Sequence, residues 1–395
     1  MCRQRFYVLG MTDDQSCSFS TEVHQLIQKG KVFSGGKRHY EIVSSILPEG
    51  AVWIDITVPL DTVFSQYEVY PEIIVFASGD PLFFGFANTI RKRLPDADIK
   101  VYPTFNSLQL LAHRMLLPYQ EMRTLSLTGR SWHSFDTALI KGENLLGLLT
   151  DRQKTPSSIA KRMLEYGYDN YRMTVGTSLG NKEKESVRTY NLHDVIDQDF
   201  DFPNCLILER TYIRKRLFGI PETAFCLLDG RSKMITKMPV RLLSLSMLDL
   251  HHKQSFWDIG FCTGSVSIEA KLQFPHLHIT AFEKREEGEQ LMLLNTRKFG
   301  TPGIVTCIND FETVDLADFQ SPDAVFIGGH GGKLIEMLEK INQVLLPGGC
   351  IVFNSVSESS LNLFKAGIES IGRRITEQHR IVIDMFNPIE IIKAE

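Results

Sequence analysis

The fold of the second half of the chain is decided by the stretch Phe256-Trp257-Asp258-Ile259-Gly260-Phe261-Cys262-Thr263-Gly264. An apolar run ends there in a turn with two glycines, and a segment of helical period, 265–273, follows directly. Such a turn lets a ligand approach the backbone, and the start of the helix offers N–H groups that have no partner within the helix. The stretch therefore predicts a strand, a ligand-binding turn and a helix within an α/β domain, although an ordinary tight turn is the simpler alternative.

Two acidic positions further along the chain strengthen the ligand-binding reading. Glu283 ends the next apolar run about 20 residues after the turn, as strand–helix–strand spacing requires, and Asp310 follows the third run. The G-x-G-x-x-G spacing of nicotinamide enzymes is absent. The pattern instead resembles class I S-adenosylmethionine methyltransferases, although Cys262 replaces the middle glycine of their loop. The resemblance implies cofactor contacts by Asp258, Gly260, Thr263, Gly264, Glu283 and Asp310.

Short apolar runs alternate with helix-period segments along most of the chain, which predicts α/β architecture with parallel sheets. In the second half we expect strands at 256–259, 279–282, 304–307, 324–327 and 350–354, and helices at 265–273, 286–298 and 333–346. In the first half we expect strands at 6–9, 52–56, 73–77, 99–102, 125–128 and 145–149, with helices at 82–94 and 157–166. Runs at 171–175, 187–190 and 205–209 lack intervening helices and predict antiparallel strands.

Turn residues and charges with little periodicity mark 210–232 as a linker. We therefore expect one domain at 1–209 and another at 233–395.

The first half carries its own strand–turn–helix motif, Ser78-Gly79-Asp80-Pro81, after the run Ile74–Ala77. This motif resembles the signature of the tetrapyrrole methyltransferase superfamily, in which the turn lines the cofactor site. The superfamily's first turn and its Pro-Gly-x-Ser-Ser loop are altered here to Gly10-Met11-Thr12-Asp13-Asp14-Gln15 and Pro103-Thr104-Phe105-Asn106-Ser107. The resemblance implies cofactor contacts by Gly10, Ser78, Gly79, Asp80, Ser107 and Leu179.

Further segments, among them Gly35–His39, Leu149–Arg152, Ser178–Gly180 and Leu208–Thr211, resemble the fused corrin-ring methyltransferases of cobalamin biosynthesis. That resemblance covers nearly the whole chain. It implies a two-lobed tetrapyrrole methyltransferase fold followed by a Rossmann-like class I methyltransferase domain. The implied reaction is S-adenosylmethionine-dependent methylation of a precorrin or cobalt-precorrin at carbon 5 by the first domain and at carbon 15 by the second. Decarboxylation of the ring C acetate accompanies the second step, and a homo-oligomer is implied as well.

A substrate that carries several carboxylates calls for Arg and Lys side chains. We expect substrate contacts by Lys37, Arg38, His39, Lys237 and Arg241. His330 lies in Gly328-Gly329-His330-Gly331-Gly332, after the fourth strand of the second half. We expect it to bind a carboxylate or to donate a proton during decarboxylation. An exposed helix face for Lys237 and Arg241, and a solvated loop for His330, are the plainer alternatives.

Composition excludes several classes of function. The formal net charge of −4 gives no electrostatic reason to expect nucleic acid. Seven scattered cysteines without a CxxC pair argue against a disulfide framework and a structural zinc site, so we expect reduced cysteines and no metal. No signal peptide or membrane-length apolar run is apparent, and we expect a cytoplasmic protein.

Two rival functions stay open. One is a noncatalytic sensor that binds S-adenosylmethionine or a tetrapyrrole, which the altered glycine loops favour. The other is a methyltransferase of RNA or protein. Gly328-Gly329-His330 stands where base methyltransferases carry an Asn/Asp-Pro-Pro-Tyr turn, which disfavours methylation of a base.

Overall fold

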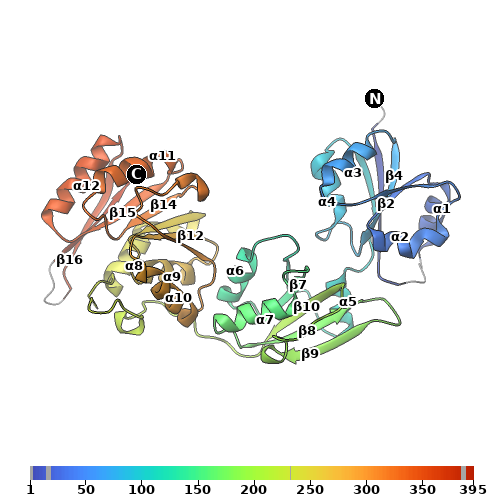
Figure 1. The fold of residues 1–395 in the computed structure, drawn as a ribbon, viewed down its shortest axis with the longest axis horizontal. Coiled ribbons are helices and arrows are strands. Elements are labelled where there is room, and N and C mark those ends of the chain that lie inside the picture. The colour runs from blue at the N-terminus through green and yellow to red at the C-terminus, as the bar shows by residue number, and fades with distance from the viewer. Residues whose placement is uncertain (1–2, 15–18, 232, 384–387) are drawn as a thin grey trace. The chain divides into compact units, whose positions relative to one another are not determined.

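The computed structural model describes residues 3–14, 19–231, 233–383 and 388–395, and Figure 1 traces them in chain order. They form two compact units. Unit 1 comprises Met1–Arg130, Asn144–Ala160 and Tyr171–Thr211, and unit 2 comprises Ser131–Glu143, Lys161–Asn170 and Tyr212–Glu395. Cys2, Gln15, Cys17 and the predicted linker end at Ser232 lie outside the described residues.

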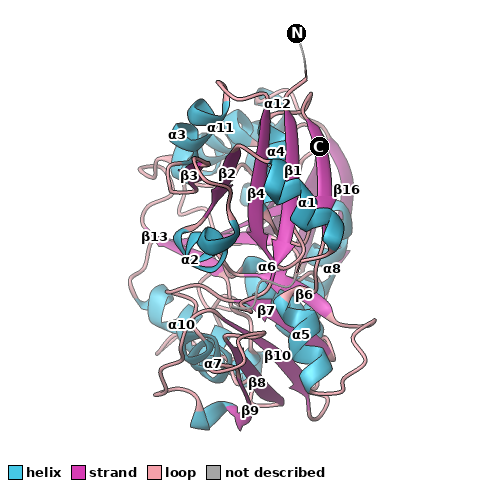
Figure 2. Ribbon diagram, turned by 90° about the vertical axis from the view of Figure 1, so that its right-hand side faces the viewer, coloured by secondary structure: helices cyan, strands magenta, loops and turns pink. Residues whose placement is uncertain are grey.

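Unit 1 contains two sheets, and the first has the order β3-β2-β4-β1-β5 with all neighbouring strands parallel. Its strands are β1 (Arg5–Met11), β2 (Val32–Gly35), β3 (Val52–Asp55), β4 (Glu72–Ser78) and β5 (Asp98–Tyr102). The helices in this part of the chain are α1 (Thr21–Lys29), α2 (Lys37–Val43), α3 (Leu60–Tyr67), α4 (Phe86–Arg93) and α5 (Ser107–Arg114). Strands β1 and β4 lie side by side (Figure 2), so the turns after Gly10 and after Ser78 meet at one edge of the sheet.

The predicted helix 82–94 begins later than expected, at Phe86. Phe84 has a φ of +52°, which ends any helical path, and Gly85 is the N-cap residue. The residues between Pro81 and Gly85 therefore form a tight turn, which places them beside the carboxyl ends of β1 and β4. The sequence pattern missed this turn because Leu82, Phe83 and Phe86 have helix-like apolar spacing.

The second sheet of unit 1 has the order β6-β7-β10-β8-β9. Its strands are β6 (Arg123–Ser126), β7 (Leu145–Leu149), β8 (Tyr171–Thr177), β9 (Ser186–Asn191) and β10 (Asn204–Arg210). Strand β10 pairs antiparallel with β7 and β8, and β8 pairs antiparallel with β9. The expectation of antiparallel strands at 171–175, 187–190 and 205–209 is confirmed.

Unit 2 is built on a sheet of order β13-β12-β11-β14-β15-β17-β16, in which the last two strands are antiparallel. Its strands are β11 (Ser255–Ile259), β12 (His278–Glu283), β13 (Ile304–Ile308), β14 (Ala324–Ile327), β15 (Cys350–Ser355), β16 (Ile375–Ile381) and β17 (Ile389–Ala394). Its later helices are α8 (Met238–Met247), α9 (Ser265–Gln273), α10 (Glu287–Phe299), α11 (Leu334–Val344) and α12 (Glu358–Ser370). The five predicted strands are confirmed, whereas the antiparallel pair β16–β17 was not predicted.

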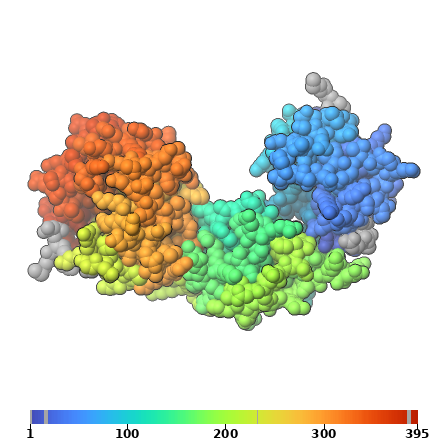
Figure 3. All heavy atoms as spheres, viewed as in Figure 1, coloured from blue at the N-terminus to red at the C-terminus, as the bar shows by residue number. Residues whose placement is uncertain are grey.

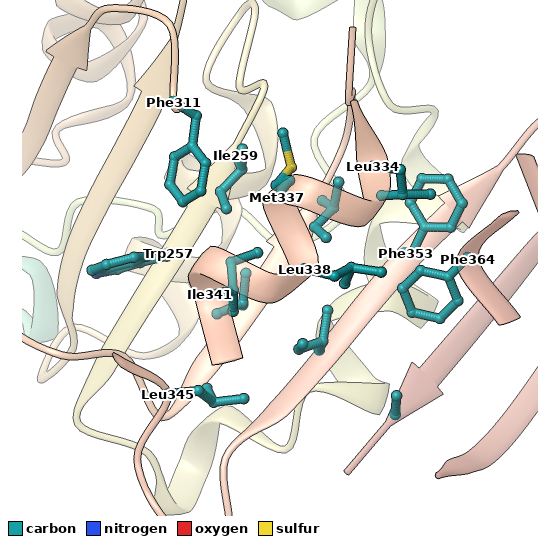
Figure 4. Packing of buried hydrophobic residues seen from close by; sticks show 14 of the residues in the cluster. Trp257, Ile259, Phe311, Leu334, Met337, Leu338, Ile341, Leu345, Phe353 and Phe364 are labelled. Atoms are coloured by element: carbon teal, nitrogen blue, oxygen red, sulfur yellow. The ribbon is translucent and has the colours of Figure 1, made fainter. Parts of the chain in front are cut away.

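Alternate side chains of the unit 2 strands enter two separate cores. Trp257 and Ile259 pack with α11 and α12 residues such as Leu338 and Phe364 on one face, as Figure 4 shows. Phe256 packs with α8 and α9 residues on the other face. Because both faces are covered, these strands are continuous apolar runs rather than alternating ones. The elements α8 to β17, coloured yellow to red in Figure 3, fill one continuous body.

Two helices from the first half of the chain contribute to unit 2, which differs from the predicted division at residues 209 and 233. They are α6 (His133–Lys141) and the end of α7 (Pro156–Glu165). His133 Nε2 lies 3.0 Å from the His276 carbonyl, and Thr137 donates to the Pro275 carbonyl at 2.9 Å. The sequence pattern gave no sign of this because helical period does not tell which core a helix joins.

Short 3₁₀ turns complete the described elements: Ser44–Ile46, Leu192–Asp194, Glu222–Ala224, Leu250–His252 and Leu316–Asp318. The mixed α/β class, a two-sheet first unit and a Rossmann-like second unit agree with expectation.

Candidate functional site

Unit 2 holds a cavity of about 530 Å³ at the carboxyl ends of β11 to β14. The strand order reverses between β11 and β14, and open α/β sheets bind ligands at such a point. The predicted residues that line the cavity are Gly260, Glu283, Asp310, His330 and Lys237. Residues that were predicted from the sequence therefore meet in one cavity, from the ends of four strands and from the segment before α8.

Gly260 is required where the first turn meets the turn after β14. Its φ is +78°, and a Cβ atom there would lie 2.8 Å from the Gly329 nitrogen and 2.9 Å from the Gly329 oxygen. A Cβ at those distances forces backbone to move, so only glycine allows the two turns to approach each other here. The Gly260 N–H also donates to the Phe282 carbonyl at 2.8 Å, which holds the turn against β12.

Glu283 connects the glycine turn to the end of β12. Its Oε2 accepts from the Cys262 N–H at 3.0 Å, and its Oε1 accepts from the Lys284 and Arg285 N–H groups at 3.0 and 3.1 Å. A carboxylate offers about four acceptor sites, so one remains on Oε2 for a donor in the cavity. This acceptor capacity fits the ribose hydroxyls of a nucleoside cofactor.

Cys262, which replaces a motif glycine, adopts a left-handed backbone conformation with a φ of +53°. Its Sγ lies 3.2 Å from the Met234 carbonyl and lines the cavity. The side chain therefore links the glycine turn to the segment 233–237, which closes one side of the cavity.

Three predicted cofactor residues, Asp258, Thr263 and Gly264, do not line this cavity, and the contacts that they make support the turn. Asp258 is fully buried, and its Oδ2 accepts from Ser267 N–H at 3.1 Å and Ser267 Oγ at 2.6 Å. Burial raises the pKa of Asp258 to about 7. Thr263 is buried, and a Cβ at Gly264 would lie 2.5 Å from a Met292 sulfur.

Arg241, predicted to contact substrate, is 0% exposed. Its Nε lies 3.3 Å from Glu269 Oε2, and its guanidinium also donates to the Thr236 and Ile220 carbonyls. The expectation for Arg241 is therefore wrong: it fixes the start of α8 and the preceding chain from inside the protein. The helical charge pattern could not distinguish this position from an exposed one.

His330 follows β14 and lies partly buried in the cavity wall. Its Nδ1 accepts from the Gly332 N–H at 3.2 Å, so in the neutral ring Nε2 carries the proton. Burial lowers the pKa of His330, which favours that neutral form. The residue can therefore donate a hydrogen bond near neutral pH without carrying a positive charge.

The cavity wall of unit 2 is rich in cations. Five basic side chains and His330 face three acidic ones, Glu283, Asp310 and Glu312. Lys333 among them pairs with Glu312. The basic residues are Lys233, Lys237, Lys284, Arg285 and Lys333. The pair Lys284-Arg285, missed from sequence, directly follows the acidic residue of the motif, and that adjacency could have revealed it.

Unit 1 holds a second cavity, of about 490 Å³, lined from both of its sheets. The predicted residues that line it are Arg38, His39, Ser78, Gly79, Ser107 and Leu179. Gly79 has a φ of +62°, and its N–H donates to the Met11 carbonyl at 2.7 Å. The β4 turn is thus held against the end of β1.

Ser78 is the centre of a directed hydrogen-bond group in this cavity. Arg38 Nη2 donates to Ser78 Oγ at 3.0 Å, and His39 Nε2 lies 2.9 Å from the same oxygen. His39 Nδ1 accepts from the Gly36 N–H at 3.1 Å, so Nε2 bears the proton in the neutral ring. Burial first, and then the Arg38 charge, lower the pKa of His39 to about 4. Because Ser78 Oγ already accepts two donors, its own proton remains to bind an acceptor in the cavity.

Three predicted residues of the first half, Gly10, Lys37 and Asp80, do not line this cavity, and their ligand contacts stay predictions. Gly10 borders a smaller cavity of about 340 Å³, and a Cβ there would lie 2.2 Å from the Gly79 oxygen. Asp80 Oδ1 accepts from the Leu82 N–H at 2.9 Å and so shapes the turn. Lys37 is exposed at the start of α2. Phe84 and Phe105, which do line the cavity, were missed as site residues.

Within the described ranges, no group of three or more His, Cys, Asp or Glu side chains is arranged to hold a metal ion. Among the same residues, no helix has the length and apolar character needed to cross a membrane.

Comparison with known proteins decides the family. A family model described as a precorrin methyltransferase domain matches residues 229–390. Cobalt-precorrin-6B C(15)-methyltransferase (decarboxylating) of Salmonella typhimurium is 36% identical over 152 residues, which cover 37% of this chain and 74% of that protein. The chain belongs to the precorrin methyltransferases. Its resemblance to the fused corrin-ring enzymes, expected from the motifs, is confirmed.

A relative of comparable length matches both halves of this precorrin methyltransferase. Precorrin-6Y C(5,15)-methyltransferase [decarboxylating] of a Sinorhizobium species is 29% identical over 355 residues, which cover 89% of this chain and 84% of that protein. A solved precorrin-6y C5,15-methyltransferase structure from Geobacter metallireducens GS-15 is 32% identical, covers 45% of this chain and 97% of that chain, and has a TM-score of 0.42.

Proposed function

We propose that this chain transfers two methyl groups from S-adenosylmethionine to a precorrin, at carbons 5 and 15, and decarboxylates the ring C acetate to a methyl group. The observation that most strongly supports this proposal is that each unit has a cavity at the carboxyl ends of parallel strands, beside a glycine turn. We assign carbon 5 to the domain at 1–209, and carbon 15 with decarboxylation to the domain at 233–395. The names of the Sinorhizobium and Salmonella relatives support this division.

The residues of both cavities fit S-adenosylmethionine. In unit 2 the free acceptor site of Glu283 and the close approach allowed by Gly260 suit a nucleoside and its methionine chain. In unit 1 Gly79 brings backbone to the wall, and Ser78 supplies a directed hydroxyl donor. When bound, the cofactor supplies an electrophilic methyl group on a sulfonium ion.

The protein's part in methyl transfer is alignment. The carbon 5 and carbon 15 positions of a reduced tetrapyrrole are enamine-like nucleophiles, so a new C–CH₃ bond forms as the S–CH₃ bond breaks. Such a step needs an aligned pair of reactants and a site without competing water more than it needs a strong base. The cations of the unit 2 wall, Lys237 and Lys284 among them, suit the peripheral carboxylates of the ring.

Decarboxylation breaks the bond between the acetate methylene and its carboxylate. Carbon dioxide leaves, the electron pair enters the conjugated ring, and a proton converts the methylene into a methyl group. His330 Nε2–H is a hydrogen-bond donor in the cavity wall. We propose that it orients the departing carboxylate in its neutral form, because burial lowers its pKa. The proton that completes the methyl group comes from water, because a neutral imidazole that gave up its Nε2 proton would become an imidazolate.

Variants that each change the cavity of one unit test which half of the chain methylates which carbon. Glu283→Ala should yield a product with one added methyl group and intact acetate, whereas Ser78→Ala should slow carbon 5 methylation and leave decarboxylation in place. Mass spectrometry with fragmentation locates each methyl group. If both variants lose the same methyl group, the division between the halves is wrong. If the wild-type chain binds S-adenosylmethionine but never turns over, the sensor alternative replaces this proposal.

The homo-oligomer, the cytoplasmic location and the absence of nucleic acid and membrane partners remain proposals. Their support is the family resemblance, the charge balance and the composition. Light scattering of the purified chain gives the oligomeric state directly, and a mass equal to one chain would exclude the oligomer.

A further inference from the structure

A strained aromatic residue stands on the wall of the unit 1 cavity. Phe84 has a φ of +52°, a conformation that bulky L residues rarely adopt, and 39% of it is exposed. The turn around it is tightly packed, since a Cβ at Gly85 would lie 2.4 Å from the Pro81 oxygen. Strained positions of this kind persist where the surrounding structure fixes them, and they gather at ligand sites.

Arg130 lies against this ring. Its guanidinium carbon is 4.9 Å from the centroid of Phe84, which is a cation–π arrangement. Arg130 is exposed, and within the described part of the chain no hydrogen bond or ion pair engages its guanidinium. Arg130 does not itself line the cavity, but Phe84 does, so the N–H groups of Arg130 are left to bind an acceptor of a ligand that stacks on Phe84.

The loop that carries Arg130 is anchored by hydrogen bonds to Thr150 and Asp151. The Gly129 N–H donates to Asp151 Oδ2 at 3.0 Å, and Thr128 Oγ1 donates to the Thr150 carbonyl at 3.0 Å. Asp151 Oδ1 accepts from the Gln153 N–H at 2.8 Å and so fixes its own turn. The segment Leu149–Arg152, singled out in the sequence, thus holds the loop that positions Arg130.

Phe105 adds a second exposed ring to the same cavity. It lies on the wall, is 51% exposed, and packs edge-to-face on His113 with ring centroids 4.9 Å apart. Two accessible rings beside a guanidinium suit a flat conjugated ring system that carries carboxylates. The rim therefore matches the substrate.

We propose that Phe84 and Arg130 form the substrate platform of unit 1. The tetrapyrrole ring stacks on Phe84, Arg130 binds one of its peripheral carboxylates, and Asp151 positions Arg130 through the loop at Gly129. This inference rests on the proposed carbon 5 methylation, and it names which residues of the cavity hold the substrate.

The test measures the KM of the full-length chain for precorrin-6Y in carbon 5 methylation, with carbon 15 methylation by the same chain as internal control. Arg130→Gln should raise that KM about tenfold or more, because a hydrogen bond to a charged group is lost. Phe84→Leu should raise it as well, and Arg130→Lys should recover part of the loss. The dissociation constant of S-adenosylmethionine should stay unchanged in each variant.

Arg91→Gln is the matched control, because Arg91 is an exposed arginine of α4 that, unlike Arg130, does not lie over the ring of a residue in the cavity wall. Asp151→Ala should raise the KM, and combining it with Arg130→Gln should add little, since both act through one contact. A KM for Arg130→Gln within twofold of wild type, or equal to that of Arg91→Gln, would overturn the platform. A wild-type chain that never methylates carbon 5 would instead refute the proposed function.

Discussion

Replacing Gly260 with alanine tests two constraints on the glycine turn of unit 2, its left-handed backbone conformation and its close contact with Gly329. The left-handed φ of +78° costs an L residue about 1–2 kcal/mol. The new Cβ also meets Gly329 backbone atoms at 2.8 to 3.1 Å, and overpacking of this kind costs about 1–3 kcal/mol more. The free energy of unfolding should therefore fall by about 2–5 kcal/mol.

Gly348→Ala is the matched control in the same unit. Gly348 has a φ of +73°, and a Cβ there meets nothing within 4 Å. Gly348→Ala should lower the free energy of unfolding by about 1 kcal/mol. Only the conformational cost applies, and the stiffer unfolded chain offsets part of it. Urea unfolding followed by circular dichroism measures both losses.

Titration calorimetry with S-adenosylmethionine supplies the functional readout for this pair of variants. The wild-type chain and Gly348→Ala should bind two molecules per chain, whereas Gly260→Ala should bind one, because its displaced turn no longer admits the ligand in unit 2. If the free energy of unfolding falls equally in the two variants, or if Gly260→Ala keeps two binding sites, the contact with Gly329 does not control the turn.

Three further predictions concern single side chains. Arg241→Met should lower the free energy of unfolding by about 3–5 kcal/mol in the same urea assay, because Glu269 is left buried without its counter-ion. Adding Glu269→Leu should recover only part of that loss, because the Gly219 and Ile220 N–H groups then lose their acceptor. Burial and Arg38 lower the pKa of His39 to about 4, so the contribution of His39 to the free energy of unfolding should be complete above pH 6.5. At pH 5 the free energy of unfolding should fall by about 2 kcal/mol, because the unfolded chain takes up a proton that the folded chain does not. His39→Gln should lose this pH dependence when urea midpoints are compared at the two pH values. His330→Ala should slow decarboxylation without changing carbon 5 methylation, and His330→Gln, which keeps an N–H donor, should retain more of the rate; equal rates for both variants would argue against a donor role.

The parts of the fold that could be predicted are those written as local patterns. The apolar runs that become β11, β12, β14 and β15 are buried on both faces, so they stand out against the helix-period segments between them. The run that becomes the edge strand β13 is only partly buried, but its position in the alternation still marks it. The turn at Gly260 and the acidic residue Glu283 were found for the same reason, because spacing along the chain fixes where they fall in a strand–helix–strand unit.

What could not be predicted depends on long-range packing. Arg241 has the sequence context of an exposed helical cation, yet Glu269 and the carbonyls around it enclose it completely. Helix α6 joins unit 2 through its contacts with the backbone at Pro275 and His276, which no local pattern encodes. Phe84 looked like a helix residue because apolar spacing does not reveal a positive φ.

The mass of the tetrapyrrole product formed by the full-length chain shows directly whether both cavities are catalytic. Precorrin-6Y or its cobalt form is incubated with S-adenosylmethionine that carries a deuterated methyl group. We predict a product that has gained two deuterated methyl groups and has lost one carbon dioxide relative to the substrate. A product that gains only one such group, or that keeps its acetate, would contradict the claim that both cavities are catalytic. Unchanged substrate beside bound S-adenosylmethionine would contradict the assignment as an enzyme of this reaction.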